Sequence, residues 1–215
     1  MKTVAAFHIL LFTLFSLSGC RGAAGGDEGA IGSVTRIVDL VEQAVSGGEL
    51  QAVAESNPLH AGDALRVTEG GEGLLDFGDQ LRLRLFNDSI LGVTAASEPG
   101  APLDVRLFLE AGGFTGELAQ SGGQAVFETP GGAQVLVQGT EFMLAYDPQN
   151  GVSTAGNFAG TVWVQSGGAL LQLPAGWWVD VSVGDQPATP RQLPFDRATY
   201  EALARQLGSP LLPLR

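Results

Sequence analysis

The chain of 215 residues has very little of what metal centres and histidine-based catalysis require. Its single cysteine, Cys20, cannot form an intramolecular disulfide or a thiolate metal site. Its two histidines, His8 and His60, are too few for a histidine metal cluster. No serine stands in a G-x-S-x-G sequence, the turn that exposes the nucleophile of many hydrolases. These shortages predict a protein without catalytic activity, metal or cofactor.

Basic residues are equally scarce. Lys2 is the only lysine, and 11 lysines and arginines stand against 23 aspartates and glutamates, which gives a net charge of −12. A chain with this balance offers no basic surface to a phosphate backbone, so we expect no binding to nucleic acid. Hydrophobic residues make up 45% of the chain, which argues against a disordered acidic tail and predicts a packed core.

The N-terminus has the pattern of an export signal. Lys2 precedes a mostly apolar stretch over residues 4–17, which is shorter than the roughly 20 residues of a membrane span and is typical of a signal peptide. It ends in LSGC at 17–20, which resembles the bacterial lipobox. That resemblance implies a lipid on the thiol of Cys20 and cleavage after residues 1–19. The alternatives are a plain signal peptide or a short membrane span with an incidental cysteine.

Four segments follow from this interpretation. Residues 1–19 form the predicted signal peptide, and residues 20–32 form a lipid anchor and a flexible, Gly/Ala-rich tether. Residues 33–190 form the folded domain, and residues 191–215 form a helical tail. We expect the protein on the extracytoplasmic side of a bacterial membrane, anchored in the cell envelope through lipid on Cys20. The acidic charge is expected to keep the domain itself away from anionic headgroups.

The folded domain is rich in alternating apolar and polar residues, the pattern of strands with one buried and one wet face. Residues 81–86, LRLRLF, show it most clearly, and Val179 and Val181 flank Asp180 in the same way. Pairs of glycines stand between such runs and allow turns at positive φ. Residues 33–47 fit either a strand or a short helix. The pattern predicts an all-β fold of stacked short strands, β-solenoid-like or a rolled sandwich, with a short C-terminal helix.

Two internal echoes favour repeated strand–turn units. Residues 68–83 and 129–144 share a threonine, a glycine pair and then leucine, glycine and leucine at the same spacing, an offset of 129 − 68 = 61 residues. Residues 59–67 and 173–181 share leucine, alanine, glycine and valine in register. Such units usually bury their apolar faces by stacking on one another.

Residues 196–208, DRATYEALARQLG, predict the helix of the tail. Asp196 is a candidate N-cap, and Gly208 can end the helix. Tyr200, Leu203 and Leu207 lie on one helical stripe, which we expect to pack against the β domain.

An ordered set of motifs resembles the FecR protein domain, an exported all-β module. The motifs are LHAGDAL at 59–65 followed by VT, LDFGDQLRL at 75–83, FLEAG at 108–112, FETP at 127–130, VQGTEF at 137–142, GTVWV at 160–164 and LPAG at 173–176. VQGTEF and FETP are the most specific, and the match covers roughly residues 33–183. The best-known relatives pass a signal from an outer-membrane receptor to a cytoplasmic sigma factor through a transmembrane helix and a cytosolic anti-sigma segment. We expect this chain to lack both and not to relay such a signal by itself.

The resemblance and the anchor together predict a non-catalytic recognition or scaffold module of the cell envelope, which contacts a protein or a glycan. One alternative is a sensor subunit of FecR-like signalling that modulates a separate regulator. Another is an envelope glycan-binding or glycan-processing protein. The candidate contact residues are Trp163, Trp177 and Trp178, which fit core or edge aromatics as well as an exposed platform. In a strand, the adjacent Trp177 and Trp178 must point to opposite faces.

Three polar residues have simpler predicted positions. Arg82 and Arg84 are expected on the wet face of their strand, either solvated or open to an acidic partner. His60, beside a turn glycine, is expected in a surface loop.

Overall fold

The computed structural model describes residues 29–97, 101–121, 123–210 and 214. Cys20, the predicted signal peptide and most of the predicted tether lie outside these residues. In chain order the elements are β1 (Gly32–Val38), β2 (Val41–Ala44), the 3-10 turn η1 (Val45–Gly47), β3 (Gln51–Ala52), β4 (Ser56–Leu59), β5 (Ala64–Val67), β6 (Glu72–Phe77), β7 (Leu81–Leu85), β8 (Ile90–Ala96), β9 (Asp104–Leu118), β10 (Gln124–Glu128), β11 (Gln134–Asp147), β12 (Val152–Ser166), β13 (Ala169–Leu173), β14 (Trp177–Ser182), β15 (Arg191–Gln192) and α1 (Arg197–Leu207).

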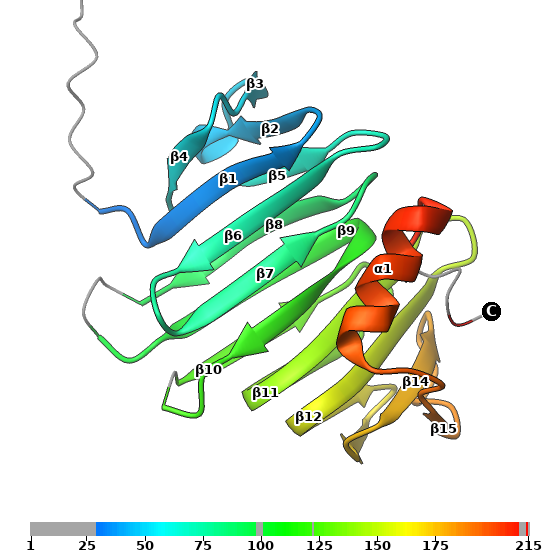
Figure 1. Ribbon diagram of the computed structural model, residues 1–215. Coiled ribbons are helices and arrows are strands. Elements are labelled where there is room, and N and C mark those ends of the chain that lie inside the picture. The colour runs from blue at the N-terminus through cyan, green and yellow to red at the C-terminus, as the bar shows by residue number, and fades with distance from the viewer. Residues whose placement is uncertain (1–28, 98–100, 122, 211–213, 215) are drawn as a thin grey trace, which may run out of the picture.

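The described strands belong to a single 15-stranded sheet that rolls over itself, with α1 on its outside (Figure 1). The main path runs β15-β14-β12-β11-β10-β9-β7-β6-β1-β4, and the remaining strands join it at the side. The predicted all-β fold with a short C-terminal helix is confirmed. Apart from the parallel pair β9 and β10, the strand pairs are antiparallel. A β-helix stacks parallel strands, so the rolled sheet is the one of the two predicted architectures that is present.

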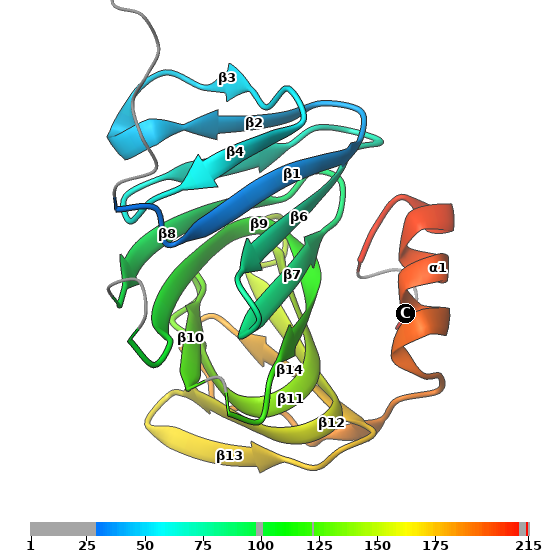
Figure 2. The ribbon, with the colours of Figure 1, turned by 60° about the vertical axis from the view of Figure 1, so that its left-hand side comes forward.

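Three strands are longer than the short strands predicted, because they run through the whole roll. β9, β11 and β12 have 15, 14 and 15 residues, and Figure 2 shows how strongly they curve. The pairing of β11 with β12 shifts register between Gln138 and Glu141. There Gly139 and Gly160 take φ of 54° and 84°, and a Cβ on Gly160 would lie 2.1 Å from the carbonyl oxygen of Gly139. The bend therefore depends on a bulge where two backbones meet without side chains.

The interior of the roll is filled by aliphatic side chains around three phenylalanines. Phe114, Phe127 and Phe142 are fully buried, and their ring centroids lie 5.0, 5.1 and 6.1 Å apart in pairs. The predicted alternation in residues 81–86 is confirmed, since its leucines are buried while its arginines lie on the outer face. Residues 33–47 form most of β1, all of β2 and the turn η1, which resolves their ambiguity in favour of strands.

The first sequence echo is a repeated turn rather than a repeated unit. In residues 68–71 and 129–132 the amide of the second glycine donates to the threonine carbonyl, at 2.9 Å in both turns. The chain then differs, because Gly78 turns the chain between β6 and β7 whereas Gly139 forms the bulge inside β11. The hydrogen-bonded Thr-x-Gly-Gly turn therefore occurs twice, 61 residues apart, but the strands and turns that follow it are not repeated.

The second echo is present in three dimensions. Leu59 and Leu173 are buried at the ends of β4 and β13. Gly62 and Gly176 follow in turns with φ of 91° and 78°, and the chain then enters β5 and β14. The same leucine–turn–strand unit therefore occurs near both ends of the rolled sheet.

Candidate functional site

Helix α1 lies on the outer face of the sheet (Figure 2). A small second core lies between them. Tyr200 and Ala204 of the helix are fully buried together with Phe86 and Met143 of the sheet side. The Tyr200 ring lies 6.2 Å from Phe86 and 5.8 Å from Phe158, measured between centroids. Its hydroxyl donates to the backbone carbonyl of Pro210, and burial raises the pKa of Tyr200. The helix is therefore a packed part of the domain.

The predicted helix boundaries are confirmed, but the predicted packing stripe is wrong beyond Tyr200. The helix begins after the N-cap Asp196 and ends at Gly208, which takes the left-handed conformation. Leu203 is only half-buried, and Leu207 is 46% exposed. The buried pair is Tyr200 and Ala204, because a large ring followed by a small residue one turn later lets the helix approach the sheet closely.

A network of charged side chains surrounds this small core. Arg197 Nε lies 2.8 Å from Glu201, and its Nη1 lies 3.2 Å from Glu117 and 3.9 Å from Glu141. Burial acts to lower the pKa of Arg197, but the hydrogen bond and charge of Glu201 and the carboxylates of β9 and β11 raise it overall. The helix is thus held to the outer face by paired charges as well as by apolar contact.

The two arginines of β7 are occupied within the chain. Arg84 binds Glu72 and lies 3.6 Å from Glu201 of the helix. Arg82 Nη2 lies 2.7 Å from Asp76, and the hydrogen bond to this carboxylate raises the pKa of Arg82. Both lie on the outer face as predicted, and each is paired with a carboxylate of the same chain.

The N-cap gives a prediction about pH. Asp196 Oδ1 accepts a hydrogen bond from the Thr199 amide at 2.8 Å, and this bond lowers the pKa of Asp196. Because the pKa is lower in the folded chain, the cap stabilises the helix above the ordinary aspartate pKa of about 4. That stabilisation is lost as the pH falls through the lower folded value. We expect the first turn of α1 to fray in acid, seen as a shift of the Thr199 amide resonance by NMR.

The matched control for this titration is Asp196→Asn. Asparagine caps helices about as well as aspartate but carries no titrating group. The variant should keep the helix and remove the acid transition of the Thr199 amide. An unchanged acid transition in Asp196→Asn would assign it to another group.

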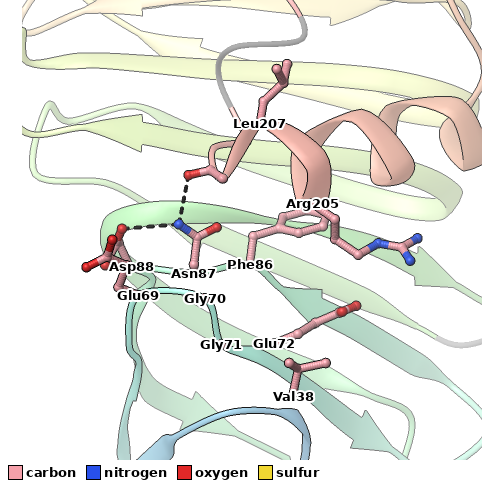
Figure 3. A pocket seen from close by; sticks show the side chains of 11 residues that line it. Val38, Glu69, Gly70, Gly71, Glu72, Phe86, Asn87, Asp88, Arg205 and Leu207 are labelled. Atoms are coloured by element: carbon pink, nitrogen blue, oxygen red, sulfur yellow. Dashed lines mark hydrogen bonds between the residues drawn. The ribbon is translucent and has the colours of Figure 1, made fainter.

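A cleft of about 520 Å³ opens beside the C-terminal end of α1 (Figure 3). One wall is the helix end at 205–208, and the other is made by the turn at 69–72 and by residues 86–88, with Val38 at the margin. Asn87 Nδ2 donates to the carbonyl oxygen of Gly208 at 2.8 Å and so joins the two walls.

The lining of the cleft is partly apolar, and most of its charged residues are acidic. Its charged residues are Glu69, Glu72, Asp88 and Arg205, so carboxylates outnumber the guanidinium. Glu72 is already paired with Arg84, whereas Glu69 and Asp88 are exposed. Such a cleft favours a cationic group over an anionic one.

The three candidate tryptophans do not form one platform. Trp178 is 6% exposed, and the Arg191 guanidinium covers its ring at 3.8 Å from the centroid. Trp177 is 37% exposed on the opposite face of β14, as alternation requires. Trp163 lies 163 − 156 = 7 residues along β12 from Gly156, the partner of Trp178, or about 20 Å along the strand.

Trp163 instead belongs to a row of partly exposed apolar side chains on the outer face. In the strand register Val126 of β10 lies opposite Leu136 of β11, and Leu136 lies opposite Trp163 of β12. Arg106 and Gln172 flank the row at its two ends. This row, Val126–Leu136–Trp163, could be found only from the register, because the three residues are far apart in the sequence.

The sequence interpretation gave no role to Asp63, a buried carboxylate in the sequence LHAGDAL at 59–65. Asp63 is 1% exposed, and it accepts from Gln43 Nε2 at 2.7 Å and from the amides of His60 at 2.9 Å and Ser46 at 3.1 Å. It ties the turn after β4 to the end of β2. His60 does lie in a loop, but its Nδ1 is buried 3.7 Å from Asp63 Oδ2. The pair Gly62-Asp63 in this sequence was the signal that could have indicated a turn-stabilising aspartate.

Within residues 29–97, 101–121, 123–210 and 214, no group of three or more His, Cys, Asp or Glu side chains is placed to hold a metal ion. Over the same ranges, no helix combines the length and the apolar character needed to cross a membrane.

Comparison with known proteins gives similarity at the level of the fold. No family model matches the chain. No curated protein matches it either. Two crystal structures of a protein assigned provisionally as an anti-sigma factor, from Parabacteroides distasonis ATCC 8503, are similar to it with a TM-score of 0.53 and 14% identity. The matches cover 65% and 66% of this chain and 64% of the other, so this chain spans somewhat less than two thirds of that protein. The rolled β domain thus shares its fold with that protein.

Proposed function

We propose that this chain is a FecR-like regulatory module that senses a partner and modulates a separate, membrane-borne regulator. The single observation that carries the proposal is the fold shared with the provisional anti-sigma factor. The FecR-like motifs support it, since Gly139 of VQGTEF forms the bulge that bends β11 and Phe142 of the same motif lies in the core. In this proposal the module is non-catalytic and stands on the extracytoplasmic side of a bacterial membrane, anchored by lipid on Cys20.

The row Val126–Leu136–Trp163 is the proposed contact with the partner. Adjacent apolar side chains that stay partly exposed are typical of protein interfaces, and tryptophan is enriched among the residues that dominate binding energy. The row lies on β10, β11 and β12, away from the paired charges that hold α1. It can therefore be altered without loosening the helix.

Transcription in the native bacterium tests the regulatory role. Deleting the gene should change the expression of a small set of genes, and the wild-type chain should restore it. Trp163→Ala should fail to restore it, because loss of about 2 kcal/mol at a dominant contact weakens binding roughly thirtyfold. Cys20→Ala should also fail and should leave the protein unmodified in mass spectrometry.

Trp177→Ala is the matched control, because Trp177 is exposed on a different strand and outside the row. It should restore expression as the wild type does. Unchanged transcription after deletion, under conditions in which the protein is made, would refute the regulatory role. Full restoration by Trp163→Ala would refute the contact site alone.

A further inference from the structure

Four described strands have one neighbour each and so form open edges of the sheet: β3, β4, β13 and β15. An open edge presents unpaired N–H and C=O groups, and proteins usually protect it with charge, proline or shortness. β3 and β15 have two residues each, and β4 contains Pro58. These three edges are protected in the usual way.

β13 lacks each of these protections. Its five residues are ALLQL, without charge or proline, and Leu170 is 68% exposed, the highest value among the large hydrophobic residues described. The loop at Asp185 and Gln186 lies against Gly167, at the hairpin turn that precedes the strand. In Figure 2 the strand runs along the outer margin of the roll beside β12. The edge is therefore open to another strand.

The hairpin fixes which groups point outward. Gly167 and Gly168 have φ of 54° and 75°, which makes the two-residue turn between Ser166 and Ala169 type I′. The pair that closes such a turn exchanges hydrogen bonds, and hydrogen-bonded pairs then alternate along the hairpin. Ala169 and every second residue after it thus bond to β12. The N–H and C=O of Leu170 and of Gln172 point to the free edge.

We propose that β13 pairs with β13 of a second copy of this chain, antiparallel and centred on Leu171, so that the rolled sheets of two copies become continuous. In this register Leu170 and Gln172 of one copy exchange hydrogen bonds with Gln172 and Leu170 of the other. Leu171 faces its own counterpart on the two-fold axis as a non-hydrogen-bonded pair. This inference does not rest on the proposed function.

The strand itself favours a second copy as the occupant. In the two-fold register the small Ala169 lies opposite the large Leu173, so the side chains on the inner face complement one another in size. No like charges meet across the seam, although the chain as a whole carries a net charge of −12. Gly168 and Pro174 flank the strand, and Pro174 has no N–H, so the pairing ends where the strand ends. A self-complementary patch of this kind is what a two-fold interface requires.

Cysteine cross-linking in membranes of cells that express the full chain tests the register. Leu171→Cys places thiols on a pair with Cα atoms about 4.5 Å apart, within disulfide range. Mild oxidation should give a dimer, and peptide mapping should locate the bond between the two residues 171. In Gln172→Cys the two thiols lie on Cα atoms about 8 Å apart in this register, too far for a bond. That variant should therefore give no disulfide-linked dimer.

A second pair of variants tests the hydrogen bonds at the edge. Gln172→Pro removes an outward N–H and leaves the ladder to β12, whereas Gln172→Thr keeps that N–H. In the Leu171→Cys background, proline should reduce cross-linking at least tenfold and threonine should not. Leu170→Lys should act as proline does, because it places a charge on the edge.

The outcomes are decisive in both directions. The proposal would be overturned if Leu171→Cys formed no disulfide bond between the two residues 171, or if Gln172→Cys cross-linked. It would also be overturned if cross-linking of Leu171→Cys were undiminished by both Gln172→Pro and Leu170→Lys. Thermal unfolding by circular dichroism confirms that each variant is folded, and Leu170→Lys, at an exposed position, replaces Gln172→Pro if the proline lowers the unfolding temperature. Failure here leaves the transcription test untouched, so the two proposals can fail separately.

Discussion

Gly160→Ala is expected to abolish folding or to lower the free energy of unfolding by more than about 4 kcal/mol. The new Cβ would lie 2.1 Å from the Gly139 carbonyl oxygen and 2.7 Å from the Thr140 Cα, both backbone atoms. The two backbones cannot separate without breaking the bulge that bends β11 and β12. The measurement is chemical denaturation followed by tryptophan fluorescence.

Gly168→Ala is the matched control. Its φ of 75° is close to the 84° of Gly160, but a Cβ there would have no heavy atom within 4 Å. It should cost only the backbone strain of an L-residue in this region, roughly 1–2 kcal/mol. Equal losses in the two variants would show that strain at positive φ, and not the close approach of backbones, accounts for the effect.

Tyr200→Ala is expected to release helix α1 from the outer face and to cost about 3–5 kcal/mol in the docking of the helix. The ring is fully buried between the sheet and the helix, and no other large side chain of α1 is fully buried. The interior of the roll forms a separate core that does not include Tyr200. Hydrogen–deuterium exchange should therefore rise across residues 197–207, while the strands around Phe127 stay protected.

Tyr200→Phe separates the ring from its hydroxyl. It keeps the aromatic contacts and removes the hydrogen bond to the Pro210 carbonyl. The loss of this bond should cost about 1–3 kcal/mol of stability. We expect faster exchange than in the wild type but a docked helix. If Tyr200→Ala leaves the exchange of α1 unchanged, the paired charges around Arg197 must hold the helix by themselves.

The outer face therefore has two regions with different properties. Under α1 it is closed by a small aromatic core and by paired charges, and along Val126–Leu136–Trp163 it stays partly exposed. The proposed self-pairing edge, β13, adjoins the second region, since Gln172 lies opposite Trp163. Partner contact and self-association would then occur on the same side of the domain, remote from the helix.

Sequence patterns predicted the features that depend on neighbours along the chain. Alternation in LRLRLF identified a strand with leucines inside, and Asp196 and Gly208 marked the two ends of α1. Such signals are local, because strand alternation and helix capping involve residues only a few positions apart in the sequence. The glycine pairs likewise marked turns, and the Thr-x-Gly-Gly turn has the same hydrogen bond in both of its copies.

Only the tertiary structure decided what lies opposite each residue. Gly139 occupies the same position in the sequence echo as the turn glycine Gly78. In the structure it lies instead in the bulge of β11, because β12 brings Gly160 against it. Tyr200 and Ala204, rather than Leu203 and Leu207, face the sheet because the surface beneath them is apolar there. Sequence by itself determined many of the strands and both caps of α1, which are properties of short segments. Register, bend and helix docking arise from contacts between distant segments, so only the folded chain determined the candidate contact row and the open edge.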